Sequence, residues 1–184
     1  MILPIYVYGQ PVLRKIGKEI DMNHKDLKNL INDMFETMYK SDGVGLAAPQ
    51  IGQSIKLFVI DGTPMAKDDP SLTDFKKVFI NPIILEESGD DCIYNEGCLS
   101  LPGIREDIVR KSIIKIKYLD ENFNPHEEIF DGMKARIIQH EYDHTNGILF
   151  IDRISPLRKK LLKRRLNDII NGKVDISYKI KIAK

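Results

Sequence analysis

The segment HEYDH, residues 140 to 144, places two histidines four positions apart. On an α-helix such positions lie on one face about one turn apart, so His140 and His144 could bind one divalent ion. Glu141 lies beside them and could reach a water bound to that ion, where a carboxylate acts as a general base. An exposed, charge-rich helix with two incidental histidines is the plain alternative. The segment therefore predicts metal-dependent hydrolysis only if a third ligand exists.

The third ligand has to come from elsewhere in the chain. The other two histidines, His24 and His126, lie in polar stretches, and neither a histidine nor a glutamate follows His144. The usual downstream ligands of HExxH metalloproteases are therefore absent. Upstream, Cys98 lies in the segment NEGCLSLPGIR, and a thiolate is a strong ligand for zinc or ferrous iron. A Cys-His-His site is the favoured arrangement.

The stretch GVGLAAPQIG, residues 43 to 52, is a third candidate region. Its small residues allow the backbone to approach a ligand closely. Gln50 offers an amide donor for negative charge that develops on a carbonyl oxygen. Small residues also let elements pack tightly, so this stretch alone does not distinguish a site from a core.

Three helices are expected to position these residues. Apolar spacing over residues 23–40 predicts an amphipathic helix, and the spacing over 133–144, followed by Gly147, predicts a helix that carries HEYDH. An N-cap serine, a proline after it and a terminal Asn-Gly predict a last helix over 155–171. The apolar stripe of that last helix is expected to consist of Leu157, Leu161, Leu162, Leu166, Ile169 and Ile170.

Strands are expected at residues 54–60, 77–85, 108–118, 127–132 and 174–182. The clearest alternation places Ile114, Ile116 and Tyr118 on one face and lysines on the other, which is typical of a half-buried antiparallel strand. The polar segment 61–77 is expected to form a long surface loop away from the motifs.

Strands and helices are segregated along the chain rather than alternating, so the predicted class is α+β. We expect antiparallel sheets packed around a central HExxH helix, with an N-terminal amphipathic helix and a C-terminal helix. Residues 1–184 are expected to form a single domain, because this length suits one core, with the helix 155–171 and the tail strand 174–182 as an appendage.

The composition is that of a globular chain, with 42% hydrophobic and 30% charged residues. The net charge of +1 argues neither for nor against an anionic partner. Neither a signal peptide nor an apolar run of membrane-spanning length is visible, so we expect a cytoplasmic protein. In a reducing compartment Cys92 and Cys98 are expected to be a buried thiol or a metal ligand rather than a disulfide, with a structural role favoured for Cys92.

Three segments in this order resemble the signature motifs of the peptide deformylases: GVGLAAPQ at 43–50, EGCLS at 96–100 and QHEYDH at 139–144. The similarity includes the start, PIYVYGQPVLRK, and covers roughly residues 2–155. The resemblance implies a bacterial enzyme that removes the formyl group from the N-terminal formyl-methionine of newly synthesised polypeptides and releases formate.

The resemblance also implies roles for individual residues. One divalent ion, Fe²⁺ natively and Zn²⁺, Ni²⁺ or Co²⁺ as substitutes, would be bound by Cys98, His140 and His144. Glu141 would take a proton from the metal-bound water and pass it to the departing amine. The metal, the Gln50 side-chain amide and the Leu99 backbone N–H would hold the oxyanion.

The same resemblance implies some of the substrate-binding residues, and the chemistry of a methionine side chain indicates the others. Gly45 and the backbone around Gly97 would pair with the extended substrate chain, and Arg105 matches a family arginine near the rim. The candidates for an apolar methionine pocket, which are also ordinary core residues, are Val44, Tyr94, Met133 and Ile137. Thr145 stands where the family commonly has leucine, and we expect it to loosen the packing under that helix.

Two other interpretations stay open. One is a zinc endopeptidase, and the other is an RNA-binding or ribosome-associated module with a structural metal. The last helix carries six basic residues within eight positions: Arg158, Lys159, Lys160, Lys163, Arg164 and Arg165. A solvated face is the plain interpretation, and contact with ribosomal RNA through its phosphates is the alternative. We expect a monomer with neither membrane nor DNA as a partner.

Overall fold

The computed structural model describes residues 1–183. Its main sheet is antiparallel throughout, with five strands in the order β2-β3-β4-β5-β6. These strands are β2 (Gly45–Ala47), β3 (Leu57–Asp61), β4 (Lys76–Gly97), β5 (Arg105–Leu119) and β6 (Pro125–Asp131). The helices are α1 (Leu27–Lys40), α2 (Gly132–Thr145), α3 (Pro156–Leu161) and α4 (Lys163–Ile170). The predicted α+β class is confirmed.

A separate two-stranded sheet pairs β1 (Ile5–Tyr6) with β7 (Ile180–Lys181) in parallel. Short 3₁₀ helices occur at η1 (Pro11–Arg14), η2 (Ala48–Ile51), η3 (Thr63–Met65), η4 (Pro70–Leu72) and η5 (Phe150–Asp152). No helix within residues 1–183 is both long enough and apolar enough to span a bilayer.

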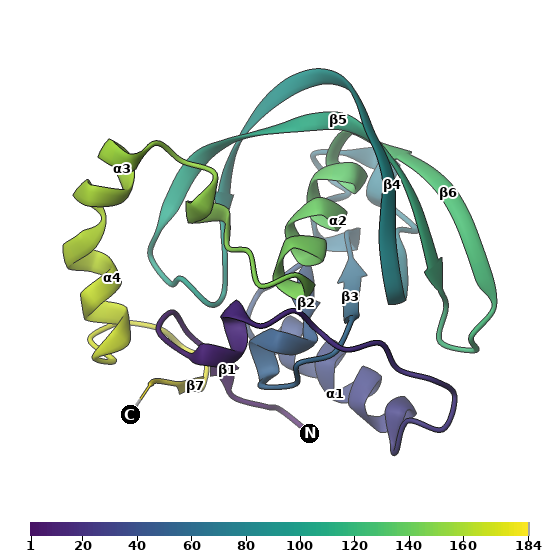
Figure 1. The fold of residues 1–184 in the computed structure, drawn as a ribbon, viewed down its shortest axis with the longest axis horizontal. Helices are drawn as coiled ribbons and strands as arrows, with labels where there is room; N and C mark the ends of the chain where they lie inside the picture. Colours follow the sequence, from purple (N-terminus) through teal and green to yellow (C-terminus); the bar gives the residue numbers. More distant parts are fainter. Residues whose placement is uncertain (184) are drawn as a thin grey trace.

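Strands β4 and β5 form a long hairpin that arches over α2 (Figure 1). The sequence predicts only the first part of β4, residues 77–85, yet the strand continues to Gly97. Three register shifts along β4 account for the difference, because each irregularity bends the strand and disturbs the alternation of its faces. Gly89, with φ of +76°, adds a turn-like signal inside the strand.

Helix α2 packs its apolar side against the main sheet. Ala135 and Ile138 are fully buried in one cluster with Phe58, Ile114 and Ile116 of β3 and β5. Thr145 is also fully buried, and its hydroxyl donates to the Tyr142 carbonyl at 2.8 Å. The hydroxyl of Thr145 is therefore satisfied inside the helix, and the expected loosening of the packing stays a prediction.

Helix α1 closes the lower side of the core, where Met34 and Met38 are fully buried against Leu46 and Leu57. The predicted start at residue 23 is four residues early, because Leu27 is the first helical residue. The strand predicted over 54–60 begins at Leu57, and all five residues of β3 are buried.

The last predicted helix is interrupted, since α3 ends at Leu161 and α4 begins at Lys163. Its N-cap is as predicted, with Ser155 accepting from the Arg158 N–H. The predicted stripe is wrong in part: Leu162, Leu166 and Ile169 are buried, but Leu157 and Leu161 are 68% and 65% exposed. The bend at Leu162 turns the first apolar residues to the surface, which the helical period of a straight helix does not reveal.

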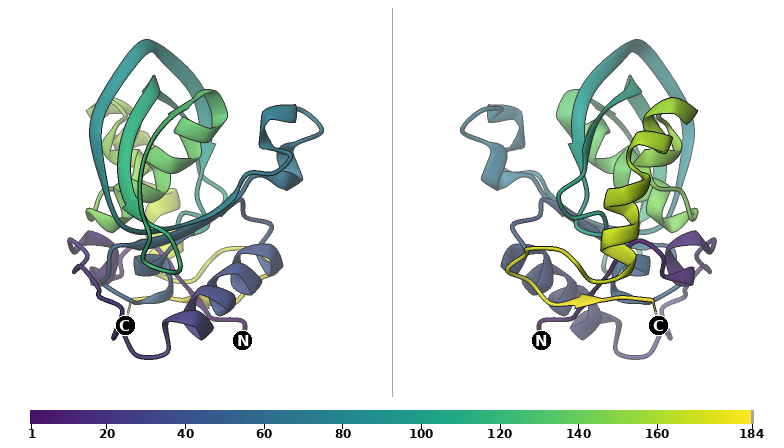
Figure 2. Two further views of the ribbon diagram at one scale, coloured as in Figure 1. Left: turned by 90° about the vertical axis from the view of Figure 1, so that its right-hand side faces the viewer. Right: turned by 90° about the vertical axis from the view of Figure 1, so that its left-hand side faces the viewer.

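Two further expectations need correction. Cys92 is exposed rather than buried, because it lies in the arched part of β4 outside the hydrophobic clusters. The segment between β3 and β4 projects from the body as a loop, as Figure 2 shows. It is not remote from the motifs, however, since Met65 lines the same cavity as Gln50 and Cys98.

Candidate metal centre and active site

Cys98, His140 and His144 come together although 46 residues separate Cys98 from His144. Cys98 follows directly after β4, and both histidines lie on α2. The thiol sulfur lies 3.2 Å from His144 Nε2, and one ligand atom from each residue lies within 4.8 Å of the others. Within residues 1–183 this is the one such group of histidine, cysteine or carboxylate ligands, and three members leave a coordination position open.

Glu96 orients the first histidine. Its Oε2 atom lies 2.9 Å from His140 Nδ1, so a protonated Nδ1 donates to the carboxylate and Nε2 keeps its lone pair for a ligand bond. Burial raises the pKa of Glu96, but hydrogen bonds from His140 and Arg110 outweigh it and hold that pKa well below the usual range. The donor set and this orientation fit a borderline divalent ion.

Arg110 connects Glu96 to the far side of α2. Its guanidinium donates to Glu96 at 2.6 and 3.0 Å and to Asp143 at 2.8 Å. Arg153 donates two further hydrogen bonds of 2.7 Å to Asp143, and Arg136 donates to Glu96 at 2.9 Å. Burial lowers the pKa of Arg110, but the two carboxylates outweigh it and raise that pKa. The cluster of predicted ligands is thus supported by a network of charges, most of them buried.

In the described part of the chain, the second histidine, His144, lacks the carboxylate partner that orients His140. His144 is 1% exposed, and its Nδ1 atom has no hydrogen-bond partner among residues 1–183. Burial, followed by the nearby charge of His140, lowers the pKa of His144 well below its usual value, which favours the neutral form that binds a metal. For His140, burial lowers the pKa, but hydrogen bonds to Cys98 and Glu96 outweigh it and raise that pKa well above its usual value. The ring is thus protonated before an ion binds, and an ion at Nε2 would displace that proton.

Glu141 is 5% exposed, and its Oε2 atom has no hydrogen-bond partner among residues 1–183. Burial is the main reason that the pKa of Glu141 rises to about 7. Gly45 makes room for this carboxylate, because a Cβ atom at residue 45 would lie 2.5 to 2.8 Å from three atoms of the Glu141 side chain. The site therefore contains a buried carboxyl group poised to exchange a proton near neutral pH.

Gln50 reaches the cluster from η2. Its Oε1 atom accepts the Ala47 N–H at 2.8 Å, and this contact directs Nε2 toward the Cys98 sulfur at 3.5 Å and Ser100 Oγ at 3.2 Å. The amide is 2% exposed. The Gln50 side chain is therefore fixed with its donor atom facing Cys98.

A cavity of about 530 Å³ opens beside this cluster. Its walls include every residue that the sequence predicts to be catalytic or substrate-binding: Val44, Gly45, Gln50, Tyr94, Gly97, Leu99, Arg105, Met133, Ile137 and Glu141. Cys98 and His140 also line it, whereas His144 does not. Arg105 is an exposed residue of this wall, and its guanidinium donates to the Asn95 carbonyl at 2.5 Å and to the Asn95 side chain at 3.0 Å.

A sequence model described as polypeptide deformylase matches residues 2–160. The chain belongs to the polypeptide deformylase family. The family match ends at residue 160, five residues beyond the range of 2–155 expected from the motifs and the N-terminal segment. The expected enzyme class, a deformylase, is confirmed.

Individual family members are similar over nearly their full length. A peptide deformylase from Christiangramia forsetii is 50% identical over 188 residues, which cover 98% of this chain and 96% of the relative. A crystal structure of a peptide deformylase from Legionella pneumophila superposes with a TM-score of 0.81 at 40% identity, covering 94% of this chain and 98% of that one. The corresponding structure from Thermotoga maritima has a TM-score of 0.76 at 44% identity, over 85% and 99% of the two chains.

Sequence reasoning did not assign roles to several residues of this deformylase-family site. Glu96 and Asp143 lie inside two of the motifs, and a carboxylate next to a predicted ligand is a signal that could have identified them. Arg110 carries a weaker signal, because the alternation of β5 places it on the same face as the buried Ile108. Ile176 and Tyr178 also line the cavity, and no motif near them indicates it.

Proposed function

We propose that this chain removes the formyl group from the N-terminal formyl-methionine of newly synthesised polypeptides, with one divalent ion held by Cys98, His140 and His144. The supporting observation is the convergence of three ligand atoms within 4.8 Å beside a cavity that Glu141 also lines. Fe²⁺ is the proposed native ion, and the same donors accept Zn²⁺, Ni²⁺ or Co²⁺. When bound, the ion supplies Lewis-acid chemistry: it lowers the pKa of water and polarises a carbonyl oxygen.

Glu141 is the proposed proton carrier. With a pKa of about 7, its carboxylate can accept a proton from the attacking water at neutral pH and then donate that proton to the departing amine. The water oxygen forms a bond to the formyl carbon, the carbon–nitrogen bond breaks, and formate and a free amino terminus result. The unpartnered Oε2 atom of Glu141 is available for this transfer.

Gln50 and Leu99 are the proposed donors to the oxyanion of the tetrahedral intermediate. The Gln50 amide is fixed by its bond to the Ala47 N–H, so its donor atom already points toward the predicted ligands and needs only to exchange a hydrogen-bond partner. Leu99 follows Cys98 directly, so its backbone N–H lies next to a predicted ligand. Both residues line the cavity.

The remaining wall supports selection of formyl-methionine. Val44, Tyr94, Met133 and Ile137 supply apolar surface for a thioether side chain, and the backbone at Gly45 and Gly97 is proposed to pair with the extended substrate. Formyl is the smallest acyl group, so a confined carbonyl site can exclude longer acyl groups. The exposed Arg105 is proposed to contact the substrate chain at the rim.

The test is formate release from a formyl-methionyl tripeptide, measured with the metal content of each preparation. Glu141→Gln should keep the ion and lower kcat about 10²- to 10⁴-fold, because proton transfer is lost. Cys98→Ala should lose the ion, because a ligand is removed. Glu127→Gln, an exposed carboxylate on β6, is the matched control and should leave both quantities unchanged. Near-normal turnover by Glu141→Gln, or internal cleavage of peptides by the wild type, would contradict the proposal.

The identity of the ion can be tested separately. Ferrous iron and a thiolate ligand are both oxidisable, so a protein that uses Fe²⁺ should lose activity in air. Preparations made with and without oxygen should therefore differ in turnover per bound ion. Equal activity in the two preparations would argue for zinc or another ion that resists oxidation.

We also propose that the exposed face of α3 and α4 contacts ribosomal RNA. Arg158 and Lys159 are engaged in ion pairs with Glu106 and Asp152. Within residues 1–183 four other basic residues of this face form no ion pair and are exposed: Lys160, Lys163, Arg164 and Arg165. These side chains are available to neutralise phosphates.

Ribosome pelleting at increasing salt tests this contact. Replacement of the four unpaired cations by Gln should weaken co-sedimentation, while Lys115→Gln with Lys117→Gln on the main sheet should not. Equal binding by both variants would contradict the contact. A monomer acting in the bacterial cytoplasm is part of the same proposal, and light scattering after size exclusion checks the oligomeric state.

A further inference from the structure

The tail after α4 runs along the lower side of the molecule to β1. Residues 173–183 lie beyond the end of the family match at residue 160, and Figure 2 shows this segment running back beneath the hairpin to β7. The backbone is anchored where the Ile5 and Val7 N–H groups donate to Lys179 and Lys181 at 2.8 and 3.2 Å. The expected strand over 174–182 is thus reduced to two paired residues, but the whole segment alternates between exposed and half-buried side chains.

The half-buried side chains of this tail reach the active-site cavity. Val174, Ile180 and Ile182 pack against the cluster that contains Val7 and Leu166. Between them, Ile176 and Tyr178 line the cavity itself. The backbone bends at Ser177 and Tyr178, and both side chains still enter the same wall. The tail is therefore part of the cavity rather than an appendage.

Tyr178 makes a specific contact with the residue after the predicted cysteine ligand. Its hydroxyl donates to the Leu99 carbonyl at 2.8 Å. Burial, followed by the charge of Cys98, raises the pKa of Tyr178 to about 12. The phenol therefore stays protonated and remains a donor over the pH range in which the chain is expected to act.

This contact restrains the orientation of Leu99. The Cys98 carbonyl accepts the Leu101 N–H at 3.0 Å, and because a peptide group is planar this bond also directs the Leu99 N–H. The Leu99 carbonyl, on the next peptide group, is held by Tyr178, and the Ser100 carbonyl accepts the Tyr8 N–H at 2.8 Å. Among these bonds the tyrosine contact is made by a side chain, so it can be removed without changing the backbone.

We infer that the tail belongs to the catalytic apparatus of this chain: the Tyr178 hydroxyl positions Leu99 as an oxyanion donor, and Ile176 forms part of the wall that binds the substrate side chains. The inference rests on the proposed function, because it assigns Leu99 the donor role given there. Tyr178 is a positioning residue, since it acts through Leu99 and not on the substrate carbonyl. Ile176 is a substrate-binding residue of the apolar wall.

The experiment compares Tyr178→Phe with Tyr6→Phe in the full-length, metal-loaded chain. Both variants lose one phenol hydroxyl from the region of the β1–β7 sheet, but the Tyr6 ring packs on Gly52, and Tyr6 does not line the cavity. Loss of a neutral hydrogen bond changes an equilibrium about 2- to 12-fold. For Tyr178→Phe we expect a loss of kcat per bound ion in this range, with KM and metal content unchanged and a Tm lower by only a few degrees. Tyr6→Phe should match the wild type in kcat.

Ile176→Ala provides the second measurement. This substitution removes apolar surface from the cavity wall and leaves the Tyr178 contact with Leu99 in place. KM for a formyl-methionyl tripeptide should therefore rise several-fold while kcat is retained. Ile176→Ala should thus change KM and not kcat, whereas Tyr178→Phe should change kcat and not KM. A general loss of stability would produce neither of these two results.

Three results would overturn the inference. The first is kcat per bound ion for Tyr178→Phe within twofold of the wild type, and the second is a loss of activity that only follows lost metal. The third is an unchanged KM for Ile176→Ala. A wild-type chain that releases no formate would overturn the proposed function and this inference together, whereas an active wild type with unaffected variants would overturn the inference alone.

Discussion

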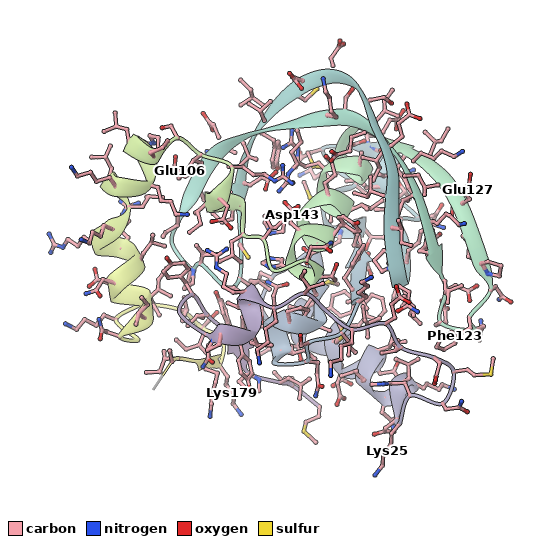
Figure 3. All side chains as sticks on the ribbon, in the orientation of Figure 1. Lys25, Glu106, Phe123, Glu127, Asp143 and Lys179 are labelled. Carbon is pink, nitrogen blue, oxygen red and sulfur yellow. The ribbon has the colours of Figure 1, made fainter. Side chains whose placement is uncertain are left out.

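Arg110 and Lys111 are neighbours on β5, yet their charges lie in opposite environments. The Arg110 side chain is fully buried and contacts Glu96 at 2.6 Å and Asp143 at 2.8 Å. The Lys111 side chain is 43% exposed and pairs with Asp91 at 3.0 Å. The distances are similar, but buried charges have lost their water and depend on one another, whereas an exposed pair is screened. Figure 3 shows Asp143 in the interior and Glu127 at the outer edge of β6.

The buried charges orient the residues of the site. Glu96 holds His140, Arg110 holds Glu96, and Asp143 holds Arg110 from the same helix that carries both histidines. Each member fixes the orientation of the next, so the network sets the geometry of the predicted ligands. By contrast, neither member of the exposed pair Lys115 and Glu127 lines the cavity.

The largest expected effect comes from breaking the buried network. Arg110→Met removes the shared cation and leaves Glu96 and Asp143 buried without it, which should lower the free energy of unfolding by about 3–5 kcal/mol. Lys111→Met on the opposite face is the matched control and should change it by about 1 kcal/mol or less. Urea denaturation measures both. Equal effects at the two positions would show that burial does not distinguish the two groups of charges.

A smaller effect is expected when the network is kept but its link to the ligands is weakened. Glu96→Gln retains a hydrogen-bond acceptor and removes the charge, so metal affinity should fall about 10- to 100-fold. Competition with a chelator measures the affinity. Glu127→Gln should leave it unchanged, and unchanged affinity in Glu96→Gln would mean that His140 is oriented without the carboxylate.

The environment of Asp152 is intermediate between the buried network and the exposed pairs. Its partly buried side chain lies between Arg14 and Lys159 and also accepts the Leu149 N–H. Burial raises its pKa, but the Arg14 hydrogen bond and these other contacts outweigh it and lower that pKa to about 2. A pKa below the unfolded value near 3.8 stabilises the fold above that pH, and the stabilisation disappears as the pH falls toward 2.

The Tm of Asp152→Asn should therefore lie below that of the wild type at pH 6, by an amount that corresponds to about 1 kcal/mol. The difference should shrink as the pH falls from about 4 toward 2. Thermal melts across this range check the sign. A difference that grows on acidification would contradict the assigned contacts.

The smallest effect belongs to the exposed pair of Lys115 and Glu127, whose side chains are 41% and 46% exposed at a distance of 2.7 Å. A double-mutant cycle with Lys115→Ala and Glu127→Ala should give a coupling of about 0.2–1 kcal/mol that falls with added salt. A coupling as large as that expected within the buried network would remove the distinction between them.

The sequence was sufficient for the elements whose signals are local. The alternation of Ile114, Ile116 and Tyr118, the N-cap at Ser155 and the stop at Gly147 were predicted correctly, because each depends on residues close in sequence. The extent of β4 and the interruption at Leu162 were not predicted. Bulges disturb the period that identifies a strand, and a short break in a helix leaves its apolar spacing almost intact.

The predicted ligands illustrate the same division at the level of the site. The residue types and the spacing of HEYDH determined that His140, Glu141 and His144 share a helix, since four residues make about one turn. Only the tertiary structure decided that Cys98 lies 3.2 Å from His144. The same is true of Arg110, which comes from β5 and contacts Asp143 on α2. Contacts between distant segments depend on how strands pair and bend, and no local pattern encodes them. The tail with Tyr178 is the clearest case, because a hydrogen bond across 79 residues joins it to Leu99.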